Sequence, residues 1–172
     1  IMADIQVLRI ASIARIVLTI IILYVIKAPP YVKVILIIMT DFIDCGMIHH
    51  YFHLYKNKQF CKTQVYQMTD KITDTLSYIL MFNYIYQNNL LNPTELYFIF
   101  GLLLFRILGT GLYLKTQNEK LLLYFPNFYL EITLLLLFIK KFNRFQQYKS
   151  ELLICVSLIK IYQEYYLHYK VR

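Results

Sequence analysis

The sequence predicts an all-α integral membrane protein, and this prediction rests on composition, on the length of the apolar segments and on the residues that separate them. Of the 172 residues, 59% are hydrophobic and 16% are charged, and the mean hydropathy is +0.49. Soluble domains are typically about 45–50% apolar and about 25% charged. The apolar excess therefore favours lipid as the surrounding solvent, and the length is that of one domain.

Six apolar segments predict a six-helix transmembrane bundle, because each is close to the roughly 20 residues that a membrane-spanning helix needs. No repeat or low-complexity linker divides the chain, so residues 1–172 are expected to form a single domain. An even number of crossings would place both ends of the bundle on one side of the membrane. The predicted segments are 7–27, 31–48, 67–87, 94–114, 121–139 and 151–169.

The first three segments are bounded by turn-forming and polar residues. Segment 7–27 stops before Pro29-Pro30, which cannot continue a helix. Segment 31–48 carries two aspartates in its last turns, and segment 67–87 carries two in its first turns. Residues 49–66 between them are polar and aromatic, which predicts an amphipathic segment at the membrane interface.

The last three segments are separated by similar signals. Pro93 follows an asparagine-rich turn and precedes segment 94–114. Segment 121–139 contains Pro126, and a basic stretch separates it from segment 151–169. Tyrosine and phenylalanine residues are interpreted as interfacial belts and packing groups.

The net charge of +8 does not predict nucleic-acid binding, because the Lys and Arg residues lie mostly in loops and at segment ends. Anionic lipid headgroups or phosphate-bearing substrates explain this distribution more simply. The three cysteines, Cys45, Cys61 and Cys155, are odd in number and predict neither a disulfide framework nor a metal site. The first segment lacks a small-residue cleavage site, so no cleavable signal peptide is expected.

Four of the five aspartates form two close pairs, Asp41 with Asp44 and Asp70 with Asp74. Spacings of three and four residues place each pair on one helix face. Because carboxylates at membrane depth are costly and repel one another, the cluster predicts a bound divalent cation. The alternative is that they are helix-end carboxylates, which suits the second pair but not the first, near a helix C-terminus.

These pairs resemble the signature of the CDP-alcohol phosphatidyltransferase family, written D-x2-D-G-x2-A-R, a spacer, then G-x3-D-x3-D. Asp41-Phe-Ile-Asp44 matches the first part, and Asp70-Lys-Ile-Thr-Asp74 matches the end of the second. The segment Ser12-Ile-Ala-Arg15-Ile16 is similar to the family's opening L-T-x-x-R-I. The six-helix layout is also similar to that of the family.

The sequence departs from the family signature at its glycines and its arginine. Cys45 stands at the first glycine position, with Gly46 one place later, and Tyr66 stands at the second. Ile48-His49 occupies the positions of the Ala-Arg pair. The spacer is also longer than in the family. A nucleotide site in this chain would therefore have to be rebuilt, with His49 as a hypothetical replacement for the phosphate-binding arginine.

The resemblance implies transfer of a phosphatidyl group from a CDP-linked lipid to an alcohol, with release of CMP. It implies Mg²⁺ or Mn²⁺ held by Asp41, Asp44, Asp70 and Asp74, with Asp74 as a ligand or as the catalytic base. It also implies a homodimer. The residues expected to contact substrate are Arg15, Gly46, His49, Lys62 and Arg106.

Arg106 lies inside an apolar segment, where an arginine requires an explanation. It could bind the phosphate of the acceptor or of the lipid, form a salt bridge to Glu131, or extend to the interface. Asn127 and Glu131, one turn apart behind Pro126, could line the acceptor pocket or satisfy the backbone that the proline interrupts.

The histidines invite an alternative interpretation as zinc ligands, since His49 and His53 are one turn apart. No cysteine or acidic residue stands nearby at a spacing typical of zinc sites, so interfacial histidines are the simpler interpretation.

Two other functions remain open at this point. The chain could be a non-catalytic membrane subunit of a larger complex that keeps the fold, or a small transporter or channel. The second requires paired broken helices that the sequence does not offer. The membrane could be the bacterial inner membrane, the mitochondrial inner membrane or the endoplasmic reticulum, and the acceptor alcohol is not specified.

Overall fold

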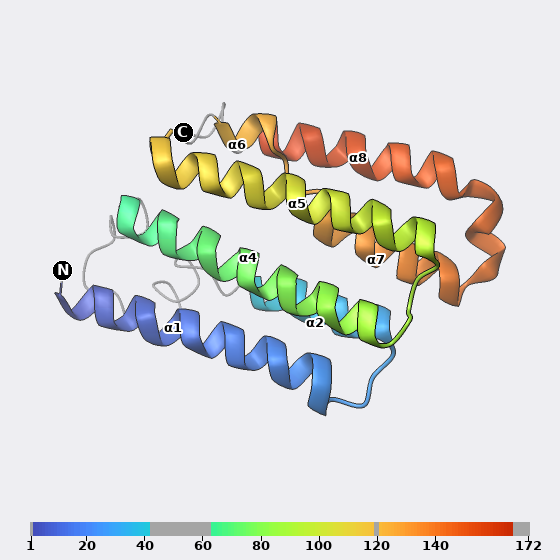
Figure 1. The fold of residues 1–172 in the computed structure, drawn as a ribbon, viewed down its shortest axis with the longest axis horizontal. Coiled ribbons are helices and arrows are strands. Elements are labelled where there is room, and N and C mark those ends of the chain that lie inside the picture. Colours follow the sequence, from blue (N-terminus) through green and yellow to red (C-terminus); the bar gives the residue numbers. More distant parts are fainter. Residues whose placement is uncertain (1, 42–62, 119–120, 167–172) are drawn as a thin grey trace. The chain divides into compact units, whose positions relative to one another are not determined.

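The computed structural model describes residues 2–41, 63–118 and 121–166, with the side chains of residues 2, 3 and 41 excepted. Across these residues the structure contains helices and turns and no strand, so the prediction of an all-α fold is confirmed. The chain forms two compact units, Ile1–Met81 and Phe82–Arg172 (Figure 1). A single six-helix domain stays a prediction.

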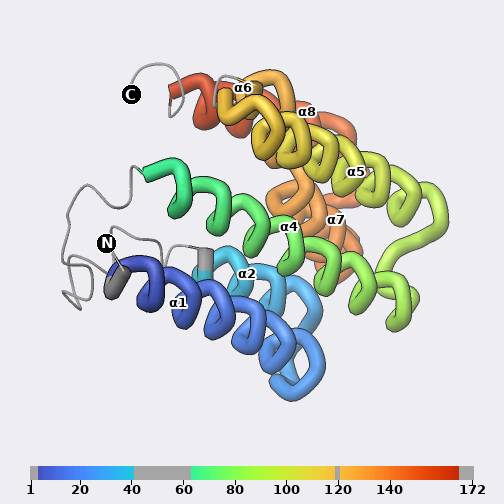
Figure 2. Tube along the Cα trace, turned by 60° about the vertical axis from the view of Figure 1, so that its left-hand side comes forward, coloured from blue at the N-terminus to red at the C-terminus, as the bar shows by residue number. Residues whose placement is uncertain are grey.

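The first unit contains α1 (Met2–Ile20), α2 (Pro30–Asp41) and most of α4 (Gln64–Gln87). A short turn joins α1 to α2, which packs against it, and α4 also lies beside α1 (Figures 1 and 2). Because α4 begins at Gln64, the last residues of the predicted interfacial segment 49–66 belong to a helix instead. Residues 49–62 of that segment lie outside the described residues.

The end of α1 widens into a π-helix, η1 (Ile21–Val25). The Ile26 backbone N–H donates to the Ile21 carbonyl oxygen over 3.0 Å, which is the longer hydrogen bond of this helix type. Lys33, on α2, is buried and its Nζ donates to the Leu23 carbonyl oxygen over 2.6 Å. A carbonyl in an apolar environment is thereby satisfied, and α2 is attached to the end of α1.

The second unit contains α5 (Pro93–Thr116), α6 (Leu121–Tyr124), α7 (Tyr129–Lys141), the 3₁₀-helix η3 (Asn143–Tyr148) and α8 (Lys149–Tyr165). The helices α5 and α8 each pack against α7, and α6 packs against both α5 and α8 (Figures 1 and 2). The start of α5 follows from its sequence. The Asn92 side chain caps the Glu95 N–H, the Glu95 carboxylate accepts from the Asn92 N–H in return, and Pro93 occupies the first helical position.

The predicted fifth helix is interrupted at residues 125–128, around Pro126. The Phe125 ring packs on the Phe105 ring of α5, with 4.9 Å between centroids. Gly109 makes this approach possible, because a Cβ placed there would lie 2.3 Å from the Phe125 Cβ. Arg106, also on α5, donates to the Phe125 carbonyl oxygen over 3.2 Å. The interruption is therefore held against α5 by shape and by a hydrogen bond.

Three described helical stretches are long and apolar enough to cross a membrane: Asp4–Val25, Pro93–Thr116 and Leu121–Lys141. The apolar part of α2, Pro30–Thr40, is shorter. The predicted count of six spans is not confirmed, because α2, α4 and α8 do not meet the same criteria within the described residues.

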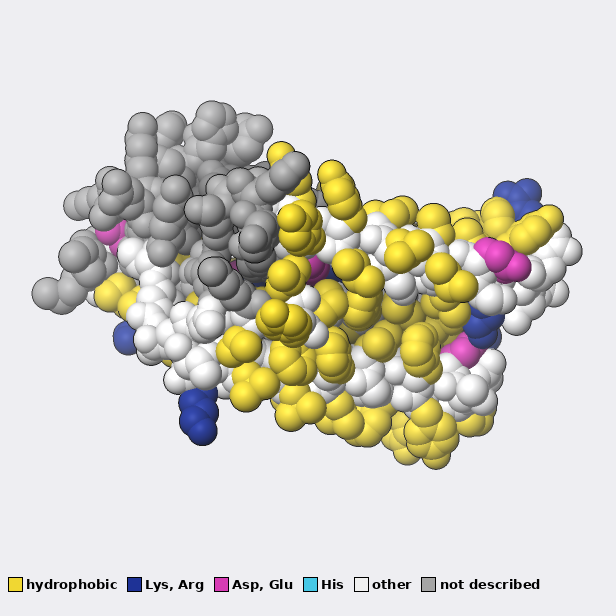
Figure 3. All heavy atoms as spheres, turned by 90° about the horizontal axis from the view of Figure 1, so that it is seen from above, with side chains coloured by type: hydrophobic (Ala, Val, Ile, Leu, Met, Phe, Trp, Pro, Cys, Tyr) yellow, Lys and Arg dark blue, Asp and Glu magenta, His cyan; other side chains and the backbone are white. Residues whose placement is uncertain are grey.

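The exposed surface supports a membrane environment. Hydrophobic side chains cover much of the face in Figure 3 that grey atoms leave visible. On α5, Tyr97 is 74% exposed and Leu108 is 62% exposed, and on α8 Leu158 and Ile159 are also exposed. Large apolar surfaces of this kind mark contact with lipid or protein. The structure is compatible with an integral membrane protein.

Candidate functional site

The second aspartate pair lies near the start of α4 and faces α1. Asp70 and Asp74 are one helical turn apart, so their carboxylates lie on the same face of α4. Arg15 of α1 contacts both of them. Its Nη1 lies 3.1 Å from Asp70 Oδ1, and its Nη2 lies 2.7 Å from Asp74 Oδ1. One guanidinium thus bridges the two carboxylates of the pair.

A second cation, Lys71, lies on the other side of the same carboxylates. Its Nζ is 2.9 Å from Asp70 Oδ2 and 3.6 Å from Asp74 Oδ2. All four carboxylate oxygens therefore have a positively charged nitrogen nearby. We refer to Arg15, Asp70, Lys71 and Asp74 as the Arg15 cluster.

The Arg15 cluster is largely removed from solvent, with Arg15 8% and Asp74 7% exposed. Small hydroxyl side chains pack beneath it. Thr19 Oγ1 donates to the Arg15 carbonyl oxygen over 2.9 Å and lies 3.5 Å from Ser77 Oγ, and both hydroxyl residues are buried. Because these side chains are small, α1 and α4 can approach closely enough for the ion pairs to form.

Among the described residues, the Arg15 cluster contains two cations and two carboxylates. Buried ions are tolerated when they are paired and hydrogen-bonded, whereas removing one partner leaves an uncompensated charge. The sequence argument assumed that the aspartates would need a metal to offset their repulsion. For Asp70 and Asp74, protein cations already provide this offset.

The other predicted metal ligands lie mostly outside the described residues. Asp41 is the last residue of α2, and its side chain lies outside the described part. Asp44, Gly46, His49 and Lys62 also lie outside the described residues. Within residues 2–41, 63–118 and 121–166, no group of three His, Cys, Asp or Glu side chains could hold a metal ion. The metal site therefore stays a prediction.

Arg106 belongs to the second unit and is not part of the Arg15 cluster. It is buried, and its described side-chain hydrogen bond goes to the Phe125 carbonyl oxygen. Its predicted alternative partner, Glu131, pairs instead with Lys160 of α8, with 2.7 Å between Oε1 and Nζ. Arg106 thus hydrogen-bonds the backbone of the non-helical residues that follow α6. Substrate binding by Arg106 stays a prediction.

Lys160 organises a second buried group of charges, between α7 and α8. Its Nζ lies 3.6 Å from Glu164 Oε1 in addition to its contact with Glu131. The Asn127 N–H donates to Glu164 Oε1 over 3.4 Å. Glu164 of α8 thus satisfies a backbone N–H at the interruption, and the two alternatives for the Asn127 and Glu131 side chains stay predictions. We refer to Lys160, Glu131, Glu164 and Asn127 as the Lys160 cluster.

Sequence reasoning assigned no role to Lys71 or Lys160. A signal for each was present, because Lys71 is three residues before Asp74 and Lys160 is four residues before Glu164. Such spacings place opposite charges on one helix face. The contacts of Lys71 with Asp70 and of Lys160 with Glu131 required the three-dimensional arrangement.

No family model, curated protein or solved structure matches this chain.

Proposed function

We propose that this chain is a divergent, metal-dependent CDP-alcohol phosphatidyltransferase that moves a phosphatidyl group from a CDP-linked lipid to an alcohol and releases CMP. The observation that carries the proposal is the Arg15 cluster. Arg15 comes from the segment similar to the family's opening motif, and Asp70 and Asp74 come from the segment that resembles its signature. Residues that are 55 and 59 positions apart thus meet in one buried site.

The reaction is compatible with the groups present. The acceptor hydroxyl oxygen forms a bond to the phosphatidyl phosphorus, the bridging P–O bond breaks, and CMP leaves with its electron pair. A carboxylate in hydrogen-bond reach of the hydroxyl takes its proton. In this proposal Asp74 takes the proton. One of the two Asp74 carboxylate oxygens must then lose its contact with Arg15 or Lys71.

The donor set fits a hard divalent cation. Carboxylate oxygens are the preferred ligands of Mg²⁺ and Mn²⁺, and Mg²⁺ is usually bound through one or two carboxylates plus substrate phosphates. Asp70 and Asp74 would hold it, with Asp41 and Asp44 as the further ligands that the resemblance implies. When bound, the metal would neutralise charge on the pyrophosphate.

Arg15 and Lys71 gain a second role in this proposal. Cations that are displaced from carboxylates by a metal become available for the phosphate oxygens of the substrate, which accept charge-assisted hydrogen bonds. The cluster would then exchange one set of ion pairs for another as the lipid enters. Orientation of the substrate phosphate by Arg15 agrees with the substrate contact that the resemblance implies.

The test is CMP release from CDP-diacylglycerol by purified protein, with Mg²⁺ or Mn²⁺ present or chelated, and with a panel of alcohols. We expect metal-dependent release, reduced about 10²–10⁴-fold by Asp74→Asn because the proton acceptor is removed. Asp70→Asn should reduce it as well. Glu151→Gln, which neutralises an exposed carboxylate in the first turn of α8, is the matched control and should leave release unchanged.

A second candidate function is that of a non-catalytic membrane subunit in a larger complex. The observation that favours it is the existing neutralisation of Asp70 and Asp74 by Arg15 and Lys71, which makes the cluster a structural link between α1 and α4. This candidate expects no CMP release with any alcohol from folded protein. It also expects that Asp70→Asn lowers thermal stability and that added metal has no effect on it.

A further inference from the structure

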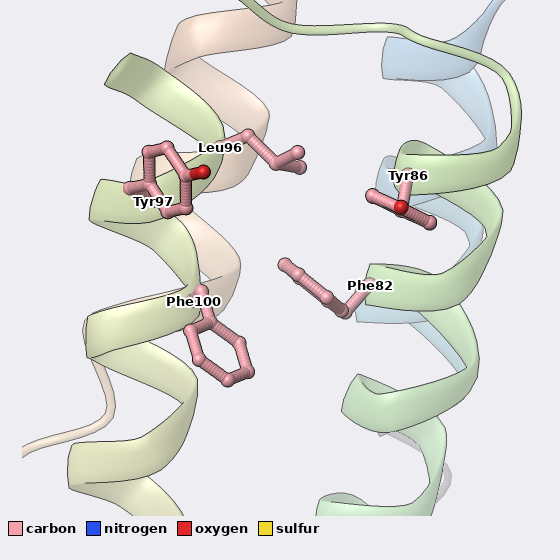
Figure 4. A pocket seen from close by; sticks show the side chains of 5 residues that line it. All are labelled: Phe82, Tyr86, Leu96, Tyr97 and Phe100. Carbon is pink, nitrogen blue, oxygen red and sulfur yellow. The ribbon is translucent and has the colours of Figure 1, made fainter. Parts of the chain in front are cut away.

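The second unit contains an apolar pocket at the start of α5. Its volume is about 240 Å³, and five side chains line it: Phe82, Tyr86, Leu96, Tyr97 and Phe100. Figure 4 shows Phe82 and Tyr86 projecting from α4 toward the three side chains of α5. Pockets that enclose a whole drug-sized molecule are about 300–1,000 Å³, so this one suits a segment of a longer apolar chain.

The pocket walls are mainly aromatic and partly open to the surroundings. The Phe82 and Phe100 rings are 5.3 Å apart between centroids, and Phe82 stacks on Tyr86 at 6.5 Å. Tyr86 is 59% and Tyr97 is 74% exposed. Exposed tyrosines next to a membrane-length helix are typical of the membrane interface, where the ring contacts lipid and the hydroxyl contacts water.

Positive charge lies near the start of α5, which lines the pocket. Lys140 Nζ donates to the Leu90 carbonyl oxygen over 2.7 Å, in the turn that precedes α5, and Lys149 pairs with Glu95, the residue before Leu96. The intervening stretch adds two exposed cations, Lys141 and Arg144. In this stretch and the first turn of α8, the only carboxylate is that of Glu151.

We propose that this pocket binds the acyl chain of an anionic phospholipid, whose phosphate is held by the basic residues 140–149. The pocket provides apolar side chains for the acyl chain, and the nearby basic residues provide cations for the phosphate of the headgroup. A polar turn, residues 88–92, marks the side at which the headgroup would meet water. Juxtamembrane Lys and Arg residues attract anionic lipids in the same way. This inference does not depend on the proposed phosphatidyl transfer.

Because the sequence contains no tryptophan, a single introduced indole gives a direct test. Phe100→Trp places one fluorescent group in the pocket wall, and we call it the pocket reporter. Leu108→Trp places one on the exposed surface of the same helix, two turns further along, and we call it the surface reporter. Each variant is reconstituted into vesicles that contain equal fractions of phosphatidylglycerol or phosphatidylcholine with brominated acyl chains, which quench indole fluorescence on contact. The fraction of brominated lipid is then varied in the same way for both lipids, and the readout is the ratio of the two fractions that give half-maximal quenching.

We expect phosphatidylglycerol to quench the pocket reporter at about a 25-fold lower lipid fraction than phosphatidylcholine, since Lys141 and Arg144 would each favour the anionic headgroup by about fivefold. The surface reporter should show no such preference. Adding Lys141→Gln and Arg144→Gln to the Phe100→Trp variant should remove the preference. The matched control is Lys115→Gln, which removes an exposed cation in the last turn of α5 and should leave the preference intact.

Two results would overturn the proposal. Equal quenching of the pocket reporter by both lipids, or the same preference at the surface reporter, would mean that only the general lipid surroundings are sensed. Weak quenching of the pocket reporter by either lipid, with normal quenching of the surface reporter, would mean that the pocket excludes lipid. Circular dichroism of each variant establishes that the helices are intact before the ratios are compared.

Discussion

Two buried charge clusters in the described part of the chain link different pairs of helices and differ in their described charges. In the Arg15 cluster, two cations face two carboxylates, and every carboxylate oxygen has a charged nitrogen within 3.6 Å. In the Lys160 cluster, a single ammonium contacts two carboxylates, and Glu131 Oε2 is buried without a hydrogen bond. The Glu131 side chain is also 33% exposed, whereas that of Asp74 is 9% exposed.

This difference indicates how each cluster contributes. The four described charges of the Arg15 cluster hold α1 to α4 together, and each loss removes a partner from a buried charge. In the Lys160 cluster, Lys160 and Glu164 are as enclosed as Arg15 and Asp74, but the Glu131 side chain is partly exposed, and water there can compensate part of a lost charge. Mutations in the first should therefore have larger effects than equivalent mutations in the second.

We expect the greatest loss of stability from Arg15→Met, which removes the guanidinium that bridges Asp70 and Asp74. Two carboxylates would then share only Lys71, and the loss of a buried partner costs about 3–5 kcal/mol. The measurement is thermal unfolding in detergent, followed by circular dichroism. Combining Arg15→Met with Asp74→Asn should recover part of the loss, because the unpaired charge is removed. No recovery in the double variant would contradict the ion-pair explanation.

A smaller loss is expected for Gly109→Ala, which acts on the part of the second unit that holds Arg106. The added Cβ would lie 2.3 Å from the Phe125 Cβ, so Phe125 and its carbonyl must move away from α5. Overpacking of this kind costs about 1–3 kcal/mol. Gly101→Ala is the matched control on the same helix, since a Cβ there meets no atom within 4 Å. Equal unfolding temperatures for the two variants would show that the contact is not tight.

Lys160→Met tests the comparison directly, because it removes the cation that pairs with the partly exposed Glu131. We expect a loss of about 1–2 kcal/mol, between the values typical of exposed and of buried pairs. The measurement is the same unfolding experiment, run beside Arg15→Met. A loss as large as that of Arg15→Met would mean that solvent access does not separate the two clusters.

Asn92→Ala should cause the smallest loss of stability. Because it removes no charge, it gives a reference value for comparison with the variants that do. The Asn92 side chain caps the Glu95 N–H over 2.9 Å at the start of α5, and loss of an N-cap costs about 1 kcal/mol. Asn92→Asp keeps the acceptor oxygen and should retain most of the stability in the same unfolding experiment. If Asn92→Ala destabilised as much as Lys160→Met, buried charge would have no special weight in the second unit.

Several local features were predictable from the sequence. The start of α5 follows from Asn92-Pro93, and the interruption after α6 surrounds the single proline of its segment, Pro126. The four-residue spacing of Asp70 and Asp74 predicted a shared helix face, and both do contact Arg15 and Lys71. These features are encoded within a few residues, since a cap, a proline or a helical spacing acts on its own turn of the chain.

Other features could not be predicted because they depend on which segments meet. Nothing near Arg15 in the sequence indicates a partner 59 residues away, and only a family resemblance connected the two. The contact of Gly109 with Phe125 and that of Lys33 with the Leu23 carbonyl oxygen also depend on which segments pack together.

The order of the amino acids was enough to predict that the described part of the chain is helical, that several of its helices are apolar enough for a membrane, and that Asp70 and Asp74 share a face. It did not establish that Arg15 and Lys71 neutralise Asp70 and Asp74, or that Lys160 rather than Arg106 pairs with Glu131. Those pairings depend on the packing of helices that are distant in the sequence. Hydrophobic periodicity and turn chemistry act within one or two helical turns, whereas the partner of a buried charge is fixed by how whole helices pack.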